Sequence, residues 1–364
     1  MMMEIKSLIW DTGTAYDFFI SLEVLHNPER FGLRGSWSAG VRSRLSPEQR
    51  RTLEQATHAI WIPLHWVYRL PAPKDGETLL RELAAIPAAE RLPNLAFRQE
   101  TPPELVEFLT SIRTRGRWDE RDLEKLKAIY KQHDRKINQD ALQDVLDAWR
   151  NPARFGEHYL EALQAYQEVF FAEEEKRIQP ALEAAVSHGQ ALAQKLSAAD
   201  LLIELSQGVR LAEDLITQKL VLAPSFWASP LIILQGLDDA VEIFVFGGRP
   251  PDVSLVPGET VPDTLLRSLK AMADPTRLRI LRYLAEKPLT PTALANKLRL
   301  RAPTVVHHLN ELRLAGLVYL SLEAPEKKSE RLYAARSESI ERVFEALQAF
   351  LVESESDPET DLED

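Results

Sequence analysis

Apolar residues recur with helical spacing through most of the chain, and this pattern predicts a mainly α-helical protein. Within residues 123–130 and 159–170 the large apolar side chains lie mostly three or four positions apart. Positions with this spacing share one face of an α-helix, so each segment is expected to bury that face. The apolar residues between Leu201 and Leu222 have a similar arrangement, and we expect a further helix there.

Two short apolar runs depart from helical spacing and predict strands. Residues 231–234 and 241–246 are rich in β-branched and aromatic side chains, and residues 236–239 lie between them as a turn. Residues 1–247 are therefore expected to form one large helical domain with a small β-sheet. The glycine- and proline-rich residues 248–263 predict a linker, because such residues interrupt helices and strands.

Residues 264–352 begin with the pattern of a helix-turn-helix. Asp274-Pro275 and Thr290-Pro291 each combine an N-cap residue with a proline at the first helical position, which predicts two helix starts. A third helix is expected to open at Pro303 and to end at Gly316. Two short helices joined by a tight turn, the second with a polar outer face, form a helix-turn-helix.

The residues after this third helix predict a wing and a last helix. Strands are expected at residues 317–322 and 331–335, on either side of a charged turn. Residues 337–352 then return to helical spacing. The whole module is therefore predicted to be a winged helix-turn-helix. Residues 353–364, with seven acidic residues and no basic one, predict a disordered acidic tail.

The charge is distributed unevenly along the chain, and this changes the meaning of the net charge of −11. Residues 264–352 contain 15 basic against 9 acidic residues, whereas residues 1–263 contain 29 basic against 39 acidic residues. A polyanion is attracted to a local basic surface rather than to the average charge. The C-terminal module therefore predicts binding to double-stranded DNA.

The third helix of the module supplies the candidate base contacts. Val305, Leu309 and Leu312 form its apolar stripe, so the opposite face is expected to lie in the major groove. We expect base contacts from His307 and Asn310, a base or phosphate contact from Thr304, and a methyl–methyl contact with thymine from Val306. Phosphate contacts are expected from basic residues nearby, because most hydrogen bonds to DNA go to its backbone. These residues are Arg277, Arg301, Lys327, Lys328 and Arg331.

The first and last helices of the module have more apolar residues than a small domain needs to cover itself. This surplus predicts a dimer interface. Its expected members are Leu265, Leu269 and Met272 on the first helix and Phe344, Leu347 and Leu351 on the last.

Two blocks of the module resemble ArsR-type winged-helix repressors. The blocks are LKAMADPTRLRIL, residues 269–281, and TVVHHLNELRLAGLV, residues 304–318. The resemblance covers about 85 residues, roughly a quarter of the chain, and two blocks in the same order are more specific than one helix-turn-helix pattern. It implies a homodimer that binds a palindromic operator and releases it when an effector binds. It also implies a dimer interface formed by the first and last helices.

The sequence departs from this family at its metal-sensing positions. Where metal-sensing members have a Cys-x-Cys pair, the resemblance aligns Thr290 and Thr292, whose hydroxyls are poor ligands for soft metals. The last helix has no histidine for the family's second metal site. We therefore expect no metal site and no cofactor. The common Ser-Gln before the reading helix is Arg301-Ala302 here, so the base contacts are expected to differ.

The remaining sequence features limit what residues 1–247 do. The chain has no cysteine, no long apolar span and no recognisable catalytic constellation, so we expect a cytoplasmic protein that is neither an enzyme nor membrane-bound. This domain is expected to contribute to dimerisation or to bind a small-molecule effector. Trp61, Trp66 and Trp227 are candidates for lining a cavity.

The sequence thus predicts a homodimeric transcriptional regulator, expected to be a repressor released by a non-metal effector. Two alternatives remain open. One is an enzyme of unknown reaction fused to a DNA-binding module, and the other is a winged helix used for protein–protein interaction.

Overall fold

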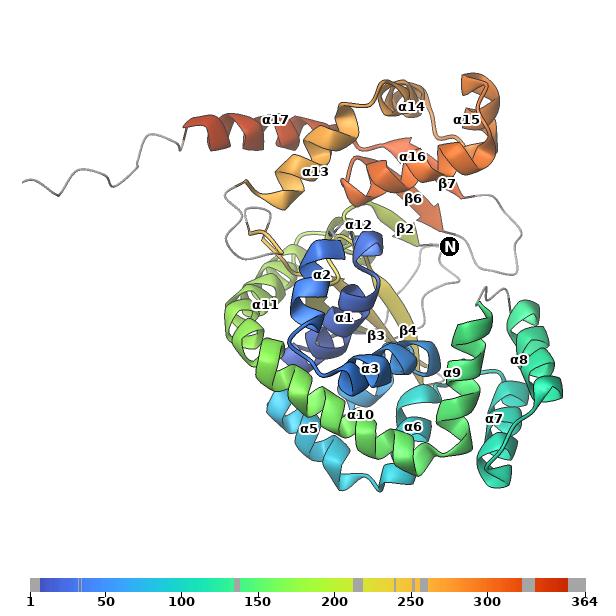
Figure 1. Cartoon of the computed structure of the whole chain (residues 1–364). Helices are drawn as coiled ribbons and strands as arrows, with labels where there is room; N and C mark the ends of the chain where they lie inside the picture. The colour runs from blue at the N-terminus through green and yellow to red at the C-terminus, as the bar shows by residue number, and fades with distance from the viewer. Residues whose placement is uncertain are drawn as a thin grey trace, which may run out of the picture. The chain divides into compact units, whose positions relative to one another are not determined.

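The chain divides into two compact units in the computed structural model (Figure 1). The structure describes residues 7–31, 33, 35–133, 138–211, 219–238, 240–250, 253–255, 261–322 and 331–352. Residues 4–190 and 217–249 form the larger unit, and residues 191–216 and 250–364, with residues 1–3, form the smaller one. The chain is mainly α-helical with small sheets, as the sequence predicted.

The larger unit consists of helices around one mixed sheet. Its helices are α1 (Thr14–His26), η1 (Pro28–Phe31), α2 (Gly35–Arg42), α3 (Pro47–Ala59), α4 (Leu64–Tyr68), α5 (Gly76–Ala85), α6 (Ala88–Ala96), α7 (Pro103–Arg115), α8 (Glu120–Gln132), α9 (Gln139–Arg150), α10 (Pro152–Tyr166), η2 (Gln167–Phe171) and α11 (Ala172–Ala193). Its strands are β1 (Ser7–Trp10), β3 (Lys219–Ser225), β4 (Ile233–Asp238) and β5 (Val241–Gly247). The helix predicted within residues 123–130 is confirmed as α8, and the one within residues 159–170 is confirmed as the end of α10 followed by the π-helical turn η2.

The sheet has the strand order β1-β3-β5-β4. Strands β1, β3 and β5 are parallel, and β4 is antiparallel to β5. β3 is buried from Leu220 to Ser225, as is usual for a parallel strand covered on both faces. The strand predicted at residues 241–246 is confirmed as β5. The strand predicted at residues 231–234 is shifted, because β4 runs from Ile233 to Asp238 and so includes residues 236–238, which were predicted as a turn.

A buried carboxylate joins α1 to the end of β3. Asp17 has no exposed surface, and it accepts hydrogen bonds from the Ser225 hydroxyl and from the backbone N–H groups of Phe226 and Trp227. Burial raises the pKa of Asp17 to about 6, although these three hydrogen bonds oppose the shift. The contact fixes the start of α1 against the sheet.

The smaller unit contains the winged helix-turn-helix. Its elements are α12 (Ala198–Leu205), β2 (Val209–Leu211), α13 (Asp263–Met272), α14 (Pro275–Glu286), α15 (Pro291–Leu298), α16 (Ala302–Leu314), β6 (Val318–Leu322), β7 (Leu332–Ala335) and α17 (Ser337–Val352). Asp274 and Thr290 cap α14 and α15 as predicted, by accepting hydrogen bonds from the backbone N–H groups of Arg277 and Ala293. The predicted wing strands and last helix correspond to β6, β7 and α17.

The helix predicted from Leu201 to Leu222 is wrong, because the described part of this segment forms α12, β2 and the first half of β3. α12 ends where Gln207 and Gly208 adopt positive φ angles of 55° and 108°, which break the helical backbone. The Ser206 hydroxyl then accepts a hydrogen bond from the Val209 N–H at 2.9 Å. Apolar spacing alone did not reveal this left-handed turn.

The position of α12 and β2 also corrects the predicted domain limits. The sequence interpretation placed every residue up to 247 in one domain, whereas residues 191–216 belong to the compact unit of the winged helix. β2 pairs in parallel with β6, so the sheet of the smaller unit has the order β2-β6-β7. Gly248 and Arg249, predicted to begin the linker, belong to the larger unit.

Candidate nucleic-acid interface

Helix α16 has one buried and one exposed face. Val305, Leu309 and Leu312 have no exposed surface and lie in the core of the winged helix with residues of α14, α15 and β6. On the other face, Thr304, His307 and Asn310 are exposed. Because residues three and four apart share a helix face, these polar side chains form one stripe.

The sequence-predicted contacts on and before α16 are thus brought together. Arg301 is exposed at the N-cap position of the helix, where its carbonyl accepts hydrogen bonds from the Thr304 and Val305 N–H groups. Val306 lies between the polar residues with 38% of its surface exposed. Arg331 is exposed immediately before β7. Lys327 and Lys328 lie outside the described residues.

Arg277 has a structural role that the sequence did not predict. It is half-buried, and its Nε and Nη2 donate hydrogen bonds to the carbonyls of Ala271 and Lys270 at 2.7 and 2.9 Å. These carbonyls end α13, so the guanidinium caps that helix. The backbone hydrogen bond from Arg277 and the charges of Arg277 and His308 lower the pKa of Asp274, the N-cap of the next helix.

Two further cations next to α16 were missed by the sequence interpretation. Lys297, in the last turn of α15, and Arg299, in the connection to α16, are exposed like Arg301. Arg299 has a φ of 57°, a left-handed conformation that ends α15 and makes the turn tight. The alternation of basic residues at positions 297, 299 and 301 was the signal for them.

His308 differs from its neighbour His307 in its surroundings. It is half-buried beside the apolar stripe, and its ring centroid lies 5.8 Å from that of His307. Its Nδ1 is buried and has no hydrogen-bond partner among the described residues. His308 is therefore not placed for base contacts in the way that His307 is.

The predicted dimer residues fall into two groups. Leu265 is buried inside the smaller unit, and Met272 is half-buried against the winged-helix core. Leu265 is therefore covered within its own chain, since it faces inward from α13, and this corrects its assignment to the interface. On α17, which packs against α13, Phe344 and Leu351 are 53% and 64% exposed. Leu269 and Leu347 are half-buried.

A buried arginine ties α12 to the base of the wing. Arg336 follows β7 and is 4% exposed, and its Nη2 lies 3.3 Å from Glu204 on α12 while its Nε lies 3.2 Å from Glu338. Glu338 also accepts a hydrogen bond from the Tyr319 hydroxyl on β6. Burial opposes ionisation of Glu338, but the contacts with Tyr319 and Arg336 leave its pKa below the usual value. α12, β2 and the wing are thus joined by backbone and charged contacts.

Within the described ranges, no three histidine, aspartate or glutamate side chains come together as metal ligands would. Among the helices of those same ranges, none combines the length and the apolar character needed to span a bilayer.

The fold and the exposed face of α16 define a helix-turn-helix domain joined to a larger helical unit, and comparison with known proteins agrees with this class. A family model described as a helix-turn-helix domain matches residues 272–319. The chain belongs to a family of unknown function (DUF5937), whose model matches residues 16–223, more than half of the chain. The family region therefore includes α12 and β2, which pack on the winged helix.

Similar proteins include helix-turn-helix regulators. An uncharacterised HTH-type transcriptional regulator of Methanocaldococcus jannaschii, MJ1325, is 46% identical over 50 residues, which are 14% of this chain and 56% of that protein. The chain thus spans about half the length of this relative. The crystal structure of NolR from Sinorhizobium fredii is 31% identical, covering 24% of this chain and 83% of that one with a TM-score of 0.20.

Proposed function

We propose that the protein is a sequence-specific, DNA-binding transcriptional regulator of the ArsR type. The observation that carries this proposal is the exposed stripe of Thr304, His307 and Asn310 on α16, opposite a fully buried apolar stripe. The second helix of a helix-turn-helix fits the major groove when one of its faces is packed in the core and the other face is polar. The blocks at residues 269–281 and 304–318 support the ArsR type.

The chemistry of the stripe fits contacts with base edges. Asn310 presents an amide that can pair with N6 and N7 of adenine, and His307 can donate to or accept from a base edge. Arg301, Lys297 and Arg299 surround the start of α16 and can contact phosphates on either side of the groove. Arg331 and the wing lysines would contact the backbone further along.

We further propose that two copies bind a palindromic operator. Phe344, Leu347 and Leu351 on α17 supply the apolar surface for a twofold interface with the helices of a second copy. Two reading helices related by this axis would meet two half-sites about one DNA turn apart.

The larger unit is proposed to regulate DNA binding through α12 and β2. This segment belongs to the DUF5937 region by sequence and to the winged helix by its contacts. An effector that binds one arrangement of this segment more tightly than another would change the population of the DNA-binding form. The size of the change would depend on the difference between the effector's affinities for the two arrangements. Release of the operator on binding a non-metal effector would make the protein a repressor.

The proposal is tested by sequencing DNA fragments that remain bound to the purified protein at near-physiological salt. We expect one enriched motif with twofold symmetry. Binding to this motif is then measured for His307→Ala and Asn310→Ala, each expected to weaken it by about 1–3 kcal/mol, or roughly 5- to 150-fold, and to relax the sequence preference.

The matched controls are His188→Ala and Gln132→Ala, which remove exposed side chains of the larger unit. They should leave the affinity unchanged. Absence of any enriched motif, or unchanged binding by both α16 variants, would overturn the proposed function.

A further inference from the structure

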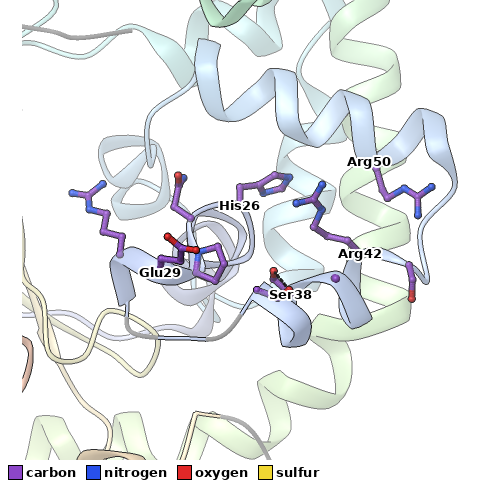
Figure 2. Close-up of a pocket in the computed structure, with 11 residues that line it drawn as sticks. His26, Glu29, Ser38, Arg42 and Arg50 are labelled. Atoms are coloured by element: carbon purple, nitrogen blue, oxygen red, sulfur yellow. Dashed lines mark hydrogen bonds between the residues drawn. The ribbon is translucent and has the colours of Figure 1, made fainter. Parts of the chain in front are cut away.

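A pocket of about 710 Å³ lies in the larger unit, away from the winged helix in sequence (Figure 2). It is formed by the end of α1, by η1, by α2 and by the start of α3, all within one compact unit. Its volume is in the range of pockets that bind small molecules. Trp61, Trp66 and Trp227, the predicted cavity residues, do not line it.

The segment that forms the pocket is basic, although the larger unit is acidic. Residues 28–51 contain six arginines and two glutamates. Arg42, at the end of α2, and Arg50, in the second turn of α3, both line the pocket and are half-buried. Neither side chain makes a hydrogen bond or ion pair with any residue in the described ranges. Two such guanidinium groups are available to a ligand.

Three further arginines of this segment, all in the described ranges, differ from Arg42 and Arg50. Arg30 lines the pocket but lies 3.6 Å from Glu23, so its charge is partly compensated. Arg44 donates a hydrogen bond to the Val169 carbonyl. Arg51 is exposed and does not line the pocket, although it follows Arg50 directly.

His26 adds a hydrogen-bond acceptor beside Arg42. Its Nδ1 lies 2.8 Å from the Leu22 carbonyl, which can only accept, so Nδ1 carries the proton. Burial lowers the pKa of His26, and the charge of Arg42 lowers it further, so the ring is neutral near pH 7. Nε2 is then an acceptor, and Figure 2 shows the His26 ring directed toward the Arg42 side chain.

We propose that this pocket binds a small molecule with an oxyanion, phosphate or carboxylate, held by Arg42 and Arg50, and with a hydroxyl or amino group directed to His26 or Glu29. A guanidinium presents paired N–H donors that match the oxygens of these anions. Glu29 lines the pocket at the η1 side and would repel the oxyanion, so the ligand is oriented with its donor groups toward that side.

The proposal is tested by calorimetric titration of the full-length protein, without DNA and at low ionic strength, with three probes. Inorganic phosphate and citrate distinguish phosphate from carboxylate recognition, and phosphoethanolamine adds an amino group to the phosphate. We expect saturable one-site binding with a Kd below roughly 10 mM for phosphate or citrate. Phosphoethanolamine is expected to bind more tightly than phosphate, and Glu29→Gln to remove this difference.

The decisive variants are Arg42→Gln and Arg50→Gln, with Arg51→Gln as the matched control of equal charge change. Each pocket variant is expected to weaken binding about tenfold or more, whereas the control should change it less than about twofold, because a charged hydrogen bond contributes more than remote charge in water. A folded Arg42→Gln protein, checked by its thermal unfolding, is required for this comparison.

Three results would overturn the proposed site. They are the absence of saturable binding by all three probes, equal affinities in wild type and in both pocket variants, and an equal loss in Arg51→Gln. Because these titrations contain no DNA, they can fail while the operator experiment succeeds, and the reverse also holds. An effect of the bound anion on operator affinity would rest on the proposed function and is measured separately.

Discussion

Asp17 is a single residue whose ionisation is expected to affect the stability of the larger unit. Its folded-state pKa of about 6 lies above the value of 3.8 for an unperturbed aspartate. Between these two pH values the folded chain binds more protons than the unfolded chain. The contribution of protonated Asp17 to the free energy of unfolding is therefore complete below pH 3.8 and is lost as the pH rises to about 6.

We predict that the difference in unfolding free energy between wild type and Asp17→Asn falls by about 2 kcal/mol from pH 4 to pH 6.5 and is nearly constant above that. The amide does not titrate, and its mismatch with the Phe226 N–H lowers the variant's stability equally at each pH. Urea unfolding at several pH values measures this difference. Asp140→Asn, at an exposed position on α9, is the control. A difference that rises with pH would contradict the prediction.

The sequence predicted the exposure or role of some single residues but not of others. The exposed positions of His307 and Asn310 followed from the buried stripe beside them, because local helical geometry determines both. The role of Arg277 did not follow, since it depends on the end of a neighbouring helix. The role of Asp17 could not be predicted for a similar reason, because its partner Ser225 is 208 positions away in the chain.

At the scale of elements, the least predictable segment was α12 with β2. The apolar residues after Leu201 suit a helix as well as a strand, and a short strand is identified mainly by its partner. That partner, β6, lies more than 100 residues further along the chain. The helix-turn-helix was predictable because its N-caps, prolines and apolar stripes are local features.

We predict that Gly208→Ala detaches β2 from the wing sheet. Gly208 has a φ of 108°, and an added Cβ would lie 3.2 Å from the Tyr319 ring and 3.3 Å from the Val318 carbonyl. The strain is expected to cost about 1–3 kcal/mol. The Leu320 N–H donates to the Gly208 carbonyl at 3.0 Å, so its hydrogen exchange should accelerate.

Gly40→Ala is the matched control for this substitution. A Cβ at Gly40 meets no atom within 4 Å, and alanine there should stabilise α2 by up to about 1 kcal/mol. Unchanged exchange of Leu320 in Gly208→Ala would show that β2 does not depend on this glycine.

The wing is expected to act through charge rather than through base contacts. We predict that replacing Lys327 and Lys328 by glutamine reduces the slope of log affinity against log salt by about 2, with little change in sequence preference. Lys131→Gln with Lys176→Gln, at exposed positions of the larger unit, gives the same charge change as a control. Fluorescence anisotropy at several salt concentrations measures the slope, and an unaltered slope would exclude the wing lysines from phosphate contacts.

At the scale of the whole molecule, the boundary between the family region and the helix-turn-helix does not coincide with the boundary between compact units. The DUF5937 region runs to residue 223, within β3, and so includes α12 and β2, although β2 belongs to the sheet of the winged helix. α11 continues along the chain into α12 and β2, which pack on the winged helix. The proposed regulation depends on this continuity and on the pairing of two chains.

The pairing of chains is tested by a charge placed on α17. Phe344, Leu347 and Leu351 share one helix face, and the outer two are more than half exposed. We predict that Phe344→Glu with Leu351→Glu converts a dimer into a monomer of 41.3 kDa, because two copies of each carboxylate would be buried in a twofold interface.

Light scattering after size exclusion measures the mass, and operator affinity should fall at the same time because the two half-sites no longer act together. Leu196→Glu, at an exposed leucine outside α13 and α17, is the control and should remain dimeric. A wild-type monomer, or a variant that stays dimeric, would mean that α17 does not form the twofold interface. An intact dimer with unchanged operator binding in the double variant would require a different surface to set the spacing of the reading helices.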